Sequence, residues 1–206
     1  MGIITKSVNS GPIIKRQIRA AWLTVLSSVF MTLPAQSVEL AASFHQGDQS
    51  QSKGYSLAVT DNFARRSPFY WTVAYNKLDK VFIDWNDSSL SFPLESIETS
   101  LSYRHKLSSR NPAMRRVSIE YQAGVSTVLT ENKFVWSELN EEKYFSEKGD
   151  VNGFVAITAH YQFASNTSVH LGLKHLPNVS EFGAISSVFL GLSYRFGANY
   201  HGNIIK

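Results

Sequence analysis

Hydrophobic and polar residues alternate with a period of two along most of the chain that follows residue 37. In the clearest segment, 117–126, Val, Ile, Tyr, Ala and Val alternate with Ser, Glu, Gln, Gly and Ser. Seven further segments alternate in the same way: 38–45, 54–63, 69–77, 96–107, 151–163, 167–176 and 186–196. A period of two places successive side chains on opposite faces of a strand. The pattern therefore predicts eight β-strands, and none of these segments has the 3.6-residue period of a helix.

The connections between these segments alternate between short and longer. Residues 63–68, 108–113 and 164–166 form short connections, whereas 78–94 and 130–150 form long ones, 177–185 is intermediate and 46–53 is modest. Outer-membrane barrels have short periplasmic turns and longer extracellular loops. The sequence therefore predicts an all-β fold, an eight-stranded antiparallel transmembrane β-barrel. The alternative is a soluble periplasmic sandwich, which would turn its apolar face inward.

The last alternating segment ends in an aromatic pattern. Val188, Leu190, Leu192, Tyr194 and Phe196 share one face of this segment. The Gly-x-x-Tyr-x-Phe pattern at 191–196 resembles the C-terminal strand by which bacterial outer-membrane barrels are recognised and assembled. This resemblance implies the outer membrane as the location and the barrel-assembly machinery as a partner during insertion.

The first 37 residues have the pattern of a secretory signal peptide. Lys6, Lys15, Arg16 and Arg19 precede the apolar run 20–33, and small residues lie at −3 and −1 of a cleavage site after residue 37. The alternative, a membrane anchor, needs about 20 apolar residues, more than this run provides. We therefore expect a cleavable signal peptide over 1–37, an outer-membrane barrel over 38–196 and a C-terminal tail over 197–206.

Removal of the signal peptide changes the charge of the chain. Of the 20 basic and 16 acidic residues, four basic and no acidic ones lie in the first 37 positions, so the mature chain is formally neutral. A neutral chain gives no argument for nucleic-acid binding. The chain has no cysteine, which excludes disulfides, thiolate chemistry and Cys-x-x-Cys metal sites. We expect no cofactor and no metal.

Charged residues fall on the inward-facing positions of the predicted strands. They are Glu39, His45, Glu98, Arg104, Lys106, Glu120, His160, His170, Lys174 and Arg195. An eight-stranded barrel is just wide enough for side chains to fill it, and buried charges have to be paired. We therefore expect a salt-bridged plug, with a proton pathway or a metal site at His160 and His170 as the alternatives.

The long connection 130–150 contains four aromatic residues among its charges. They are Phe134, Trp136, Tyr144 and Phe145. Charged loops are usually solvated surface, but several exposed aromatics in one loop are typical of a contact surface. Two interpretations remain for this loop: solvated surface, or a contact with lipopolysaccharide or a protein partner.

The sequence Leu-Lys-His-Leu-Pro-Asn at 173–178 lies at the end of the seventh predicted strand. By parity, His175 faces lipid. The segment resembles the outer-membrane lipid A deacylase family (PagL type, acyloxyacyl hydrolases), eight-stranded barrels with a His-x-Ser-Asn motif and an acid on the next strand. The resemblance implies that His175 is the base and that Asn178 matches the Asn. Pro177 stands at the nucleophile position and has no hydroxyl, and no acid occurs at 186–189.

Three functions follow from these observations. The first is a non-enzymatic envelope scaffold or partner-binding barrel that resembles a deacylase. The second is an active lipid A 3-O-deacylase-like esterase, in which Ser180, Ser186 or Ser187 supplies the nucleophile and Glu181 the orienting acid. The third is a surface adhesin or recognition barrel that acts through the aromatic loop. The candidate catalytic residues are therefore His175, Asn178, Ser180 and Glu181, and Pro177 favours the non-enzymatic function.

Overall fold

The computed structural model describes residues 38–48, 52–64, 67–85, 88–136, 141–179 and 182–196, with the backbone alone at 83–85, 88–89, 134–136 and 141–143. The predicted signal peptide and C-terminal tail lie outside these residues. The described part contains β1 (Glu39–Gly47), β2 (Lys53–Asn62), β3 (Phe69–Trp85), β4 (Ser88–Lys106), the 3-10 turn η1 (Met114–Arg116), β5 (Val117–Val128), β6 (Asn132–Trp136), β7 (Glu141–Ser146), β8 (Val151–Gln162), β9 (Thr167–Leu176) and β10 (Ile185–Arg195). No helix in this part is long and apolar enough to cross a membrane.

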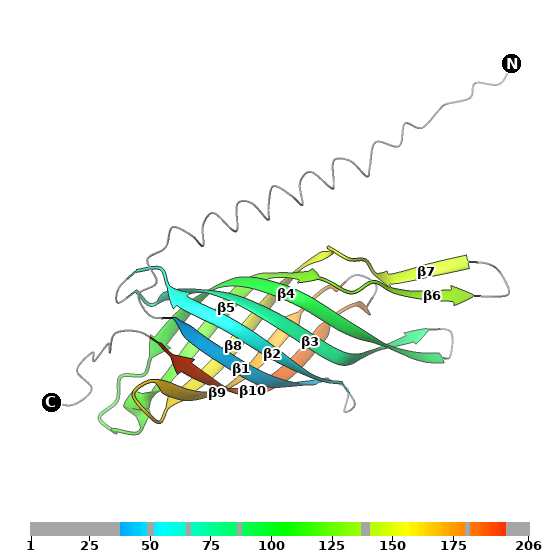
Figure 1. Cartoon of the computed structure of the whole chain (residues 1–206). Helices are drawn as coiled ribbons and strands as arrows, with labels where there is room; N and C mark the ends of the chain where they lie inside the picture. Colours follow the sequence, from blue (N-terminus) through cyan, green and yellow to red (C-terminus); the bar gives the residue numbers. More distant parts are fainter. Residues whose placement is uncertain are drawn as a thin grey trace, which may run out of the picture. The chain divides into compact units, whose positions relative to one another are not determined.

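Eight of the strands form one closed barrel in the order β1-β10-β9-β8-β5-β4-β3-β2 (Figure 1). Strand β1 closes it, because β1 pairs antiparallel with β2 on one side and with β10 on the other. The register places Glu39 opposite Arg195 and Phe44 opposite Leu190. This closed sheet confirms the predicted eight-stranded antiparallel barrel. The sandwich alternative is wrong, because a sandwich consists of two separate sheets packed face to face.

Side chains alternate between the lumen and the outer surface of this sheet. On β8, Phe154, Ala156, Thr158 and His160 are buried, whereas the residues between them are exposed. Large apolar side chains dominate the outer face, and many of them are about half exposed: Leu57, Leu101, Val155, Ile157, Leu171, Leu173, Leu190 and Leu192. The predicted parity, with apolar residues outward and polar residues inward, is therefore confirmed.

The two ends of the barrel differ in their connections. One end, called the turn end, has short turns between β2 and β3 and between β8 and β9, and η1 between β4 and β5. Strand β1 begins and β10 ends there. At the opposite end, called the loop end, the β3–β4 hairpin and the β6–β7 hairpin extend past the other strands (Figure 1).

The predicted loop 78–94 is wrong in one respect, because most of it continues β3 and β4. These strands run on to Trp85 and from Ser88, and their register shifts between Leu78 and Val81. The shift moves the inward positions from even to odd numbers, since Asn76 and Val81 are both buried. When a strand is traced in the sequence by its period of two, the trace therefore ends at this register shift, although the strand itself continues.

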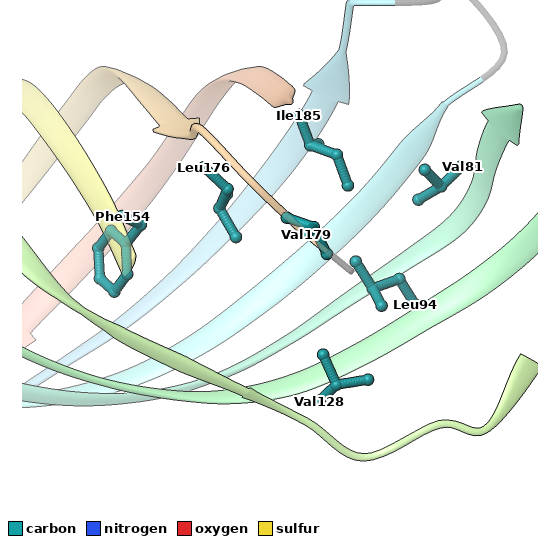
Figure 2. Packing of buried hydrophobic residues seen from close by; sticks show 7 residues of the cluster. All are labelled: Val81, Leu94, Val128, Phe154, Leu176, Val179 and Ile185. Carbon is teal, nitrogen blue, oxygen red and sulfur yellow. The ribbon is translucent and has the colours of Figure 1, made fainter. Parts of the chain in front are cut away.

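The loop end of the lumen is filled by an apolar cluster, called the loop-end cluster. Its buried members are Val81, Leu94, Val128, Phe154, Leu176, Val179 and Ile185 (Figure 2). They come from β3, β4, β5, β8, β9 and β10 and from the segment after β9, and Val179 is completely buried. Leu78 and Phe182 pack against the cluster. Hydrocarbon therefore closes the lumen at this end.

Candidate functional site

A network of ion pairs fills the lumen toward the turn end. Arg104 lies at its centre: Nη1 is 3.1 Å from Oε2 of Glu39, and Nε donates to Oε2 of Glu120 over 2.9 Å. Glu39 also accepts a hydrogen bond from Arg195 at 2.5 Å, and Glu120 lies 2.8 Å from Nε2 of His160. Each buried carboxylate thus faces an arginine, which offsets the cost of removing both charges from water.

A second ion pair lies nearer the loop end. Lys174 Nζ donates to Glu98 over 2.7 Å and to Asn76 over 3.1 Å, and it lies 5.4 Å from the ring centroid of Phe154. The Asn76, Glu98 and Lys174 side chains are all buried. Together with the Arg104 network, this pair confirms the predicted salt-bridged plug. Lys106 is exposed at the rim and forms no ion pair with any residue that the structure describes.

The histidines of the lumen are held by hydroxyl groups and by each other. His45 Nε2 lies 2.8 Å from Ser56 Oγ, and His170 Nε2 lies 2.7 Å from Ser43 Oγ. The rings of His160 and His170 are 5.6 Å apart. No group of three metal-ligating side chains occurs in the part of the chain that the structure describes, so these residues give no support to the metal alternative.

Two glycines leave room for the rings that cross the lumen. A Cβ at Gly172 would lie 2.3 Å from Phe189, and one at Gly191 would lie 2.5 Å from His170. Phe189 occupies this space and stacks on His45 with ring centroids 5.2 Å apart. The middle of the lumen is therefore packed with rings.

The outer wall presents a histidine and a serine side by side. His175 on β9 pairs in register with Ser186 on β10, and His175 Nδ1 lies 2.8 Å from Ser186 Oγ. His175 is exposed on the outer face, as its parity predicted. Asn178 is exposed beyond the end of β9, and the structure shows no contact between it and His175. The other candidates, Ser180 and Glu181, lie outside the described residues.

A groove of about 520 Å³ surrounds this pair. Its apolar lining comes from the outer face of β8, β9 and β10: Val155, Ile157, Leu173 and Val188. Asp48 lines the same groove and its backbone N–H donates to the Ser186 carbonyl over 3.1 Å. Sequence reasoning missed Asp48 because it follows β1, although the pairing of β1 with β10 brings it beside Ser186.

The histidine–serine pair contains two of the three groups of a serine hydrolase. The imidazole can accept a proton from the hydroxyl, and a carboxylate bonded to the other ring nitrogen would orient it. In the described part of the chain no carboxylate forms a hydrogen bond or ion pair with His175, and it is Nδ1 that faces the serine. The structure therefore brings base and hydroxyl together without the orienting acid.

The aromatic loop is a hairpin that is anchored to the barrel. Strands β6 and β7 pair within the predicted loop 130–150, and Asn132 Nδ2 donates to the Pro93 carbonyl over 2.9 Å. Phe145 is 1 % exposed and packs on Phe92, so its expected exposure is wrong. Tyr144 is exposed and has Lys133 Nζ 5.9 Å from its ring centroid. The side chains of Phe134 and Trp136 are not among those that the structure describes.

No known family profile matches this sequence, and no curated protein matches it either. Solved structures do match the fold. The N-terminal β-barrel domain of Pseudomonas aeruginosa OprF is 12 % identical with a TM-score of 0.50, over 78 % of this chain and 98 % of that domain. Ail, the attachment invasion locus protein of Yersinia pestis, is 14 % identical with a TM-score of 0.46, over 78 % and 95 %. The outer membrane enzyme PagL is 15 % identical with a TM-score of 0.46, over 78 % and 99 %.

At these identities the similarity shows the fold alone. The chain is a small eight-stranded barrel of the outer-membrane type.

Proposed function

We propose that this protein is exported by a signal peptide over 1–37 and resides in the bacterial outer membrane as a barrel over 38–196, followed by a tail over 197–206. The support is the outer wall, where Leu101, Leu173 and Leu192 are 61 %, 56 % and 57 % exposed. Soluble proteins rarely expose a continuous apolar surface of this extent, whereas a lipid bilayer covers it. The aromatic end of β10 is the feature that the barrel-assembly machinery would recognise.

Within that membrane we propose a non-enzymatic scaffold that binds a partner through its loop end. One observation carries this proposal: ion pairs cross the lumen and hydrocarbon closes it at the loop end, while two hairpins extend beyond it. A barrel closed in this way has no open path for solutes, so its function lies on its surface. The exposed Tyr144 on the anchored β6–β7 hairpin supplies the kind of rigid aromatic that contact surfaces favour. The partners are lipopolysaccharide or a surface protein, including the recognition role of an adhesin.

Site-specific photo-crosslinking in intact cells tests this function. A photoreactive amino acid at Tyr144 is expected to form a defined adduct with lipopolysaccharide or with one envelope protein. The matched control places the same amino acid at Tyr161, an exposed aromatic near the turn end of β8, where the hairpin partner is out of reach. The proposal fails if Tyr144 gives no adduct, or gives only the adducts formed from Tyr161.

A second function, a lipid A acyl-ester hydrolase, is favoured by the 2.8 Å contact between His175 and Ser186 in an apolar groove. In this mechanism Ser186 Oγ attacks the ester carbonyl while His175 accepts its proton. The alcohol leaves with that proton, and water then hydrolyses the acyl-enzyme. We place this function second because no described carboxylate orients His175.

Mass spectrometry of lipid A from cells with and without the protein separates the two functions. The scaffold predicts identical lipid A in both, and no change with Ser186→Ala or His175→Ala. Ser187→Ala is the matched control, because Ser187 faces the lumen one position away. Loss of one ester-linked acyl chain that requires Ser186 and His175 but not the Ser187 hydroxyl would establish the hydrolase and contradict the scaffold.

A further inference from the structure

A cavity of about 200 Å³ opens at the turn end of the lumen, at the opposite end from the loop-end cluster. Its lining comes from the ends of β1, β3, β4, β8, β9 and β10, together with η1, the first residues of β5 and the turn between β8 and β9. Five of the lining side chains are cationic: Arg104, Lys106, Arg115, Arg116 and Arg195. Glu39 is the one carboxylate that lines it within the described residues. We call this cavity the cationic mouth.

The cations at the base of the mouth are already neutralised. Arg104 is held between Glu39 and Glu120, and Arg195 shares Glu39. These four groups balance in charge. They also fix the Arg104 guanidinium, since its side chain is only 9 % exposed and lies 4.5 Å from the ring centroid of Tyr70. The base of the cavity is therefore neutral and rigid.

The cations at its rim have no such compensation. Lys106 and Arg116 form no ion pair with any residue that the structure describes, and the Arg115 side chain donates to the carbonyl of Ser109, over 2.8 Å, and to no carboxylate within the described residues. Three positive charges thus face one cavity. Charges of one sign around a concave site beside low-dielectric walls concentrate ions of the opposite sign.

We propose that the cationic mouth binds a small soluble oxyanion with several charges, of the diphosphate class. Guanidinium groups match phosphate oxygens with two parallel hydrogen bonds, and Lys106 adds a point charge. Hydroxyl donors of Ser118 and Thr167 lie in the same lining. The base is neutral, so the three uncompensated cations at the rim set the net charge of the mouth and favour anions with more than one charge.

The location of the mouth favours a soluble anion over a lipid headgroup. Its lining residues end or begin strands on the lumen side, and Glu39, Arg104 and Ser193 point inward from the sheet. Outward positions on the same strands, including Leu40 and Tyr194, separate the mouth from the surrounding lipid. In an outer-membrane barrel the turn end faces the periplasm, so the ligand would enter from there.

Calorimetric titration of inorganic pyrophosphate into the folded full-length barrel in zwitterionic detergent tests the proposal. We expect saturable binding that weakens at least tenfold in Lys106→Gln/Arg116→Gln. The matched control Lys53→Gln removes a charge at the loop end and should change the affinity less than twofold. Unboiled gel mobility confirms that each variant is folded. If the double variant does not fold, the single variant Lys106→Gln is expected to bind at least threefold more weakly.

Two results would overturn the proposal. One is the absence of saturable binding, and the other is an equal loss of affinity in Lys53→Gln. Repeating the titration in nanodiscs of two lipids distinguishes a soluble anion from a lipid headgroup. The affinity for pyrophosphate is expected to be the same in phosphatidylcholine and phosphatidylglycerol nanodiscs. Loss of binding in phosphatidylglycerol alone would assign the mouth to a lipid headgroup and contradict a soluble ligand. These measurements do not depend on the loop-end function.

Discussion

Toward the turn end the lumen is crossed by ion pairs, whereas at the loop end it is filled by hydrocarbon. The Arg104 network joins β1, β4, β5 and β10 through bonds that require one arrangement of donors and acceptors. The loop-end cluster joins β3, β4, β5, β8, β9 and β10 by contacts that have no direction. A directional network can specify which residues of neighbouring strands face each other, while apolar packing tolerates small displacements. We therefore expect the turn end to specify the register and the loop end to seal the barrel.

The largest effect is expected from Arg104→Met. This change leaves Glu120 buried without its arginine and Glu39 with Arg195 alone, and removing one partner of a buried pair costs about 3 to 5 kcal/mol. Urea unfolding of the barrel in lipid vesicles measures it. The double variant Arg104→Met/Glu120→Gln should recover much of the loss, because Glu39 keeps Arg195 as its partner and no buried carboxylate remains unpaired. A loss below 1 kcal/mol for Arg104→Met would show that the network does not specify the turn end.

The next effect extends the comparison to the outer wall. Ile157→Arg places a charge near the middle of β8 on the apolar face and is expected to cost about 2 to 4 kcal/mol in a bilayer. Val151→Arg, on the same face at the rim of the same strand, is expected to cost at most about 1 kcal/mol. Equal costs in vesicle unfolding would mean that lipid does not cover this wall.

A smaller effect is expected from Leu94→Ala in the loop-end cluster. Leu94 is buried among Val81, Val128 and Val179, and its truncation should cost about 2 kcal/mol, near the low end for buried leucine, because a non-directional cluster can partly collapse. Unfolding in the same vesicles gives the value. A cost above that of Arg104→Met would reverse the roles assigned to the two ends.

The smallest effect is expected from Ser43→Ala between the two ends. His170 Nε2 then loses its hydroxyl partner at 2.7 Å, which corresponds to about 1 kcal/mol for one hydrogen bond in a part-buried site. Ser109→Ala, whose hydroxyl accepts from the Asn111 N–H in an exposed turn, is the control and should change stability little. Indistinguishable values for the two variants would show that the lumen histidines are not held by these hydroxyls.

The sequence predicted the parts of this fold that depend on alternation within one strand. The eight barrel strands, the inward ion-pairing residues and the outward position of His175 all follow from a period of two. The extension of β3 beyond Leu78 was missed because a register shift reverses the parity. The burial of Phe145 was missed because it depends on packing against Phe92 from a different hairpin.

For the candidate site too, the sequence predicted local properties but not contacts between strands. That His175 faces outward is a local property, but its contact with Ser186 depends on the register between β9 and β10. The place of Asp48 in the groove depends on the closure of the barrel through β1. The cationic mouth combines residues from eight elements whose ends meet only when the sheet closes. Alternation therefore predicts the direction of a side chain, and pairing decides its neighbours.

Cell fractionation combined with gel mobility tests the central claim, an outer-membrane barrel with a lipid-covered wall, most directly. The protein is expected in the outer-membrane fraction, soluble only with detergent, and it should migrate faster before boiling than after, because the closed barrel resists unfolding by the detergent. Recovery in the soluble periplasm without detergent, or identical migration before and after boiling, would contradict the account.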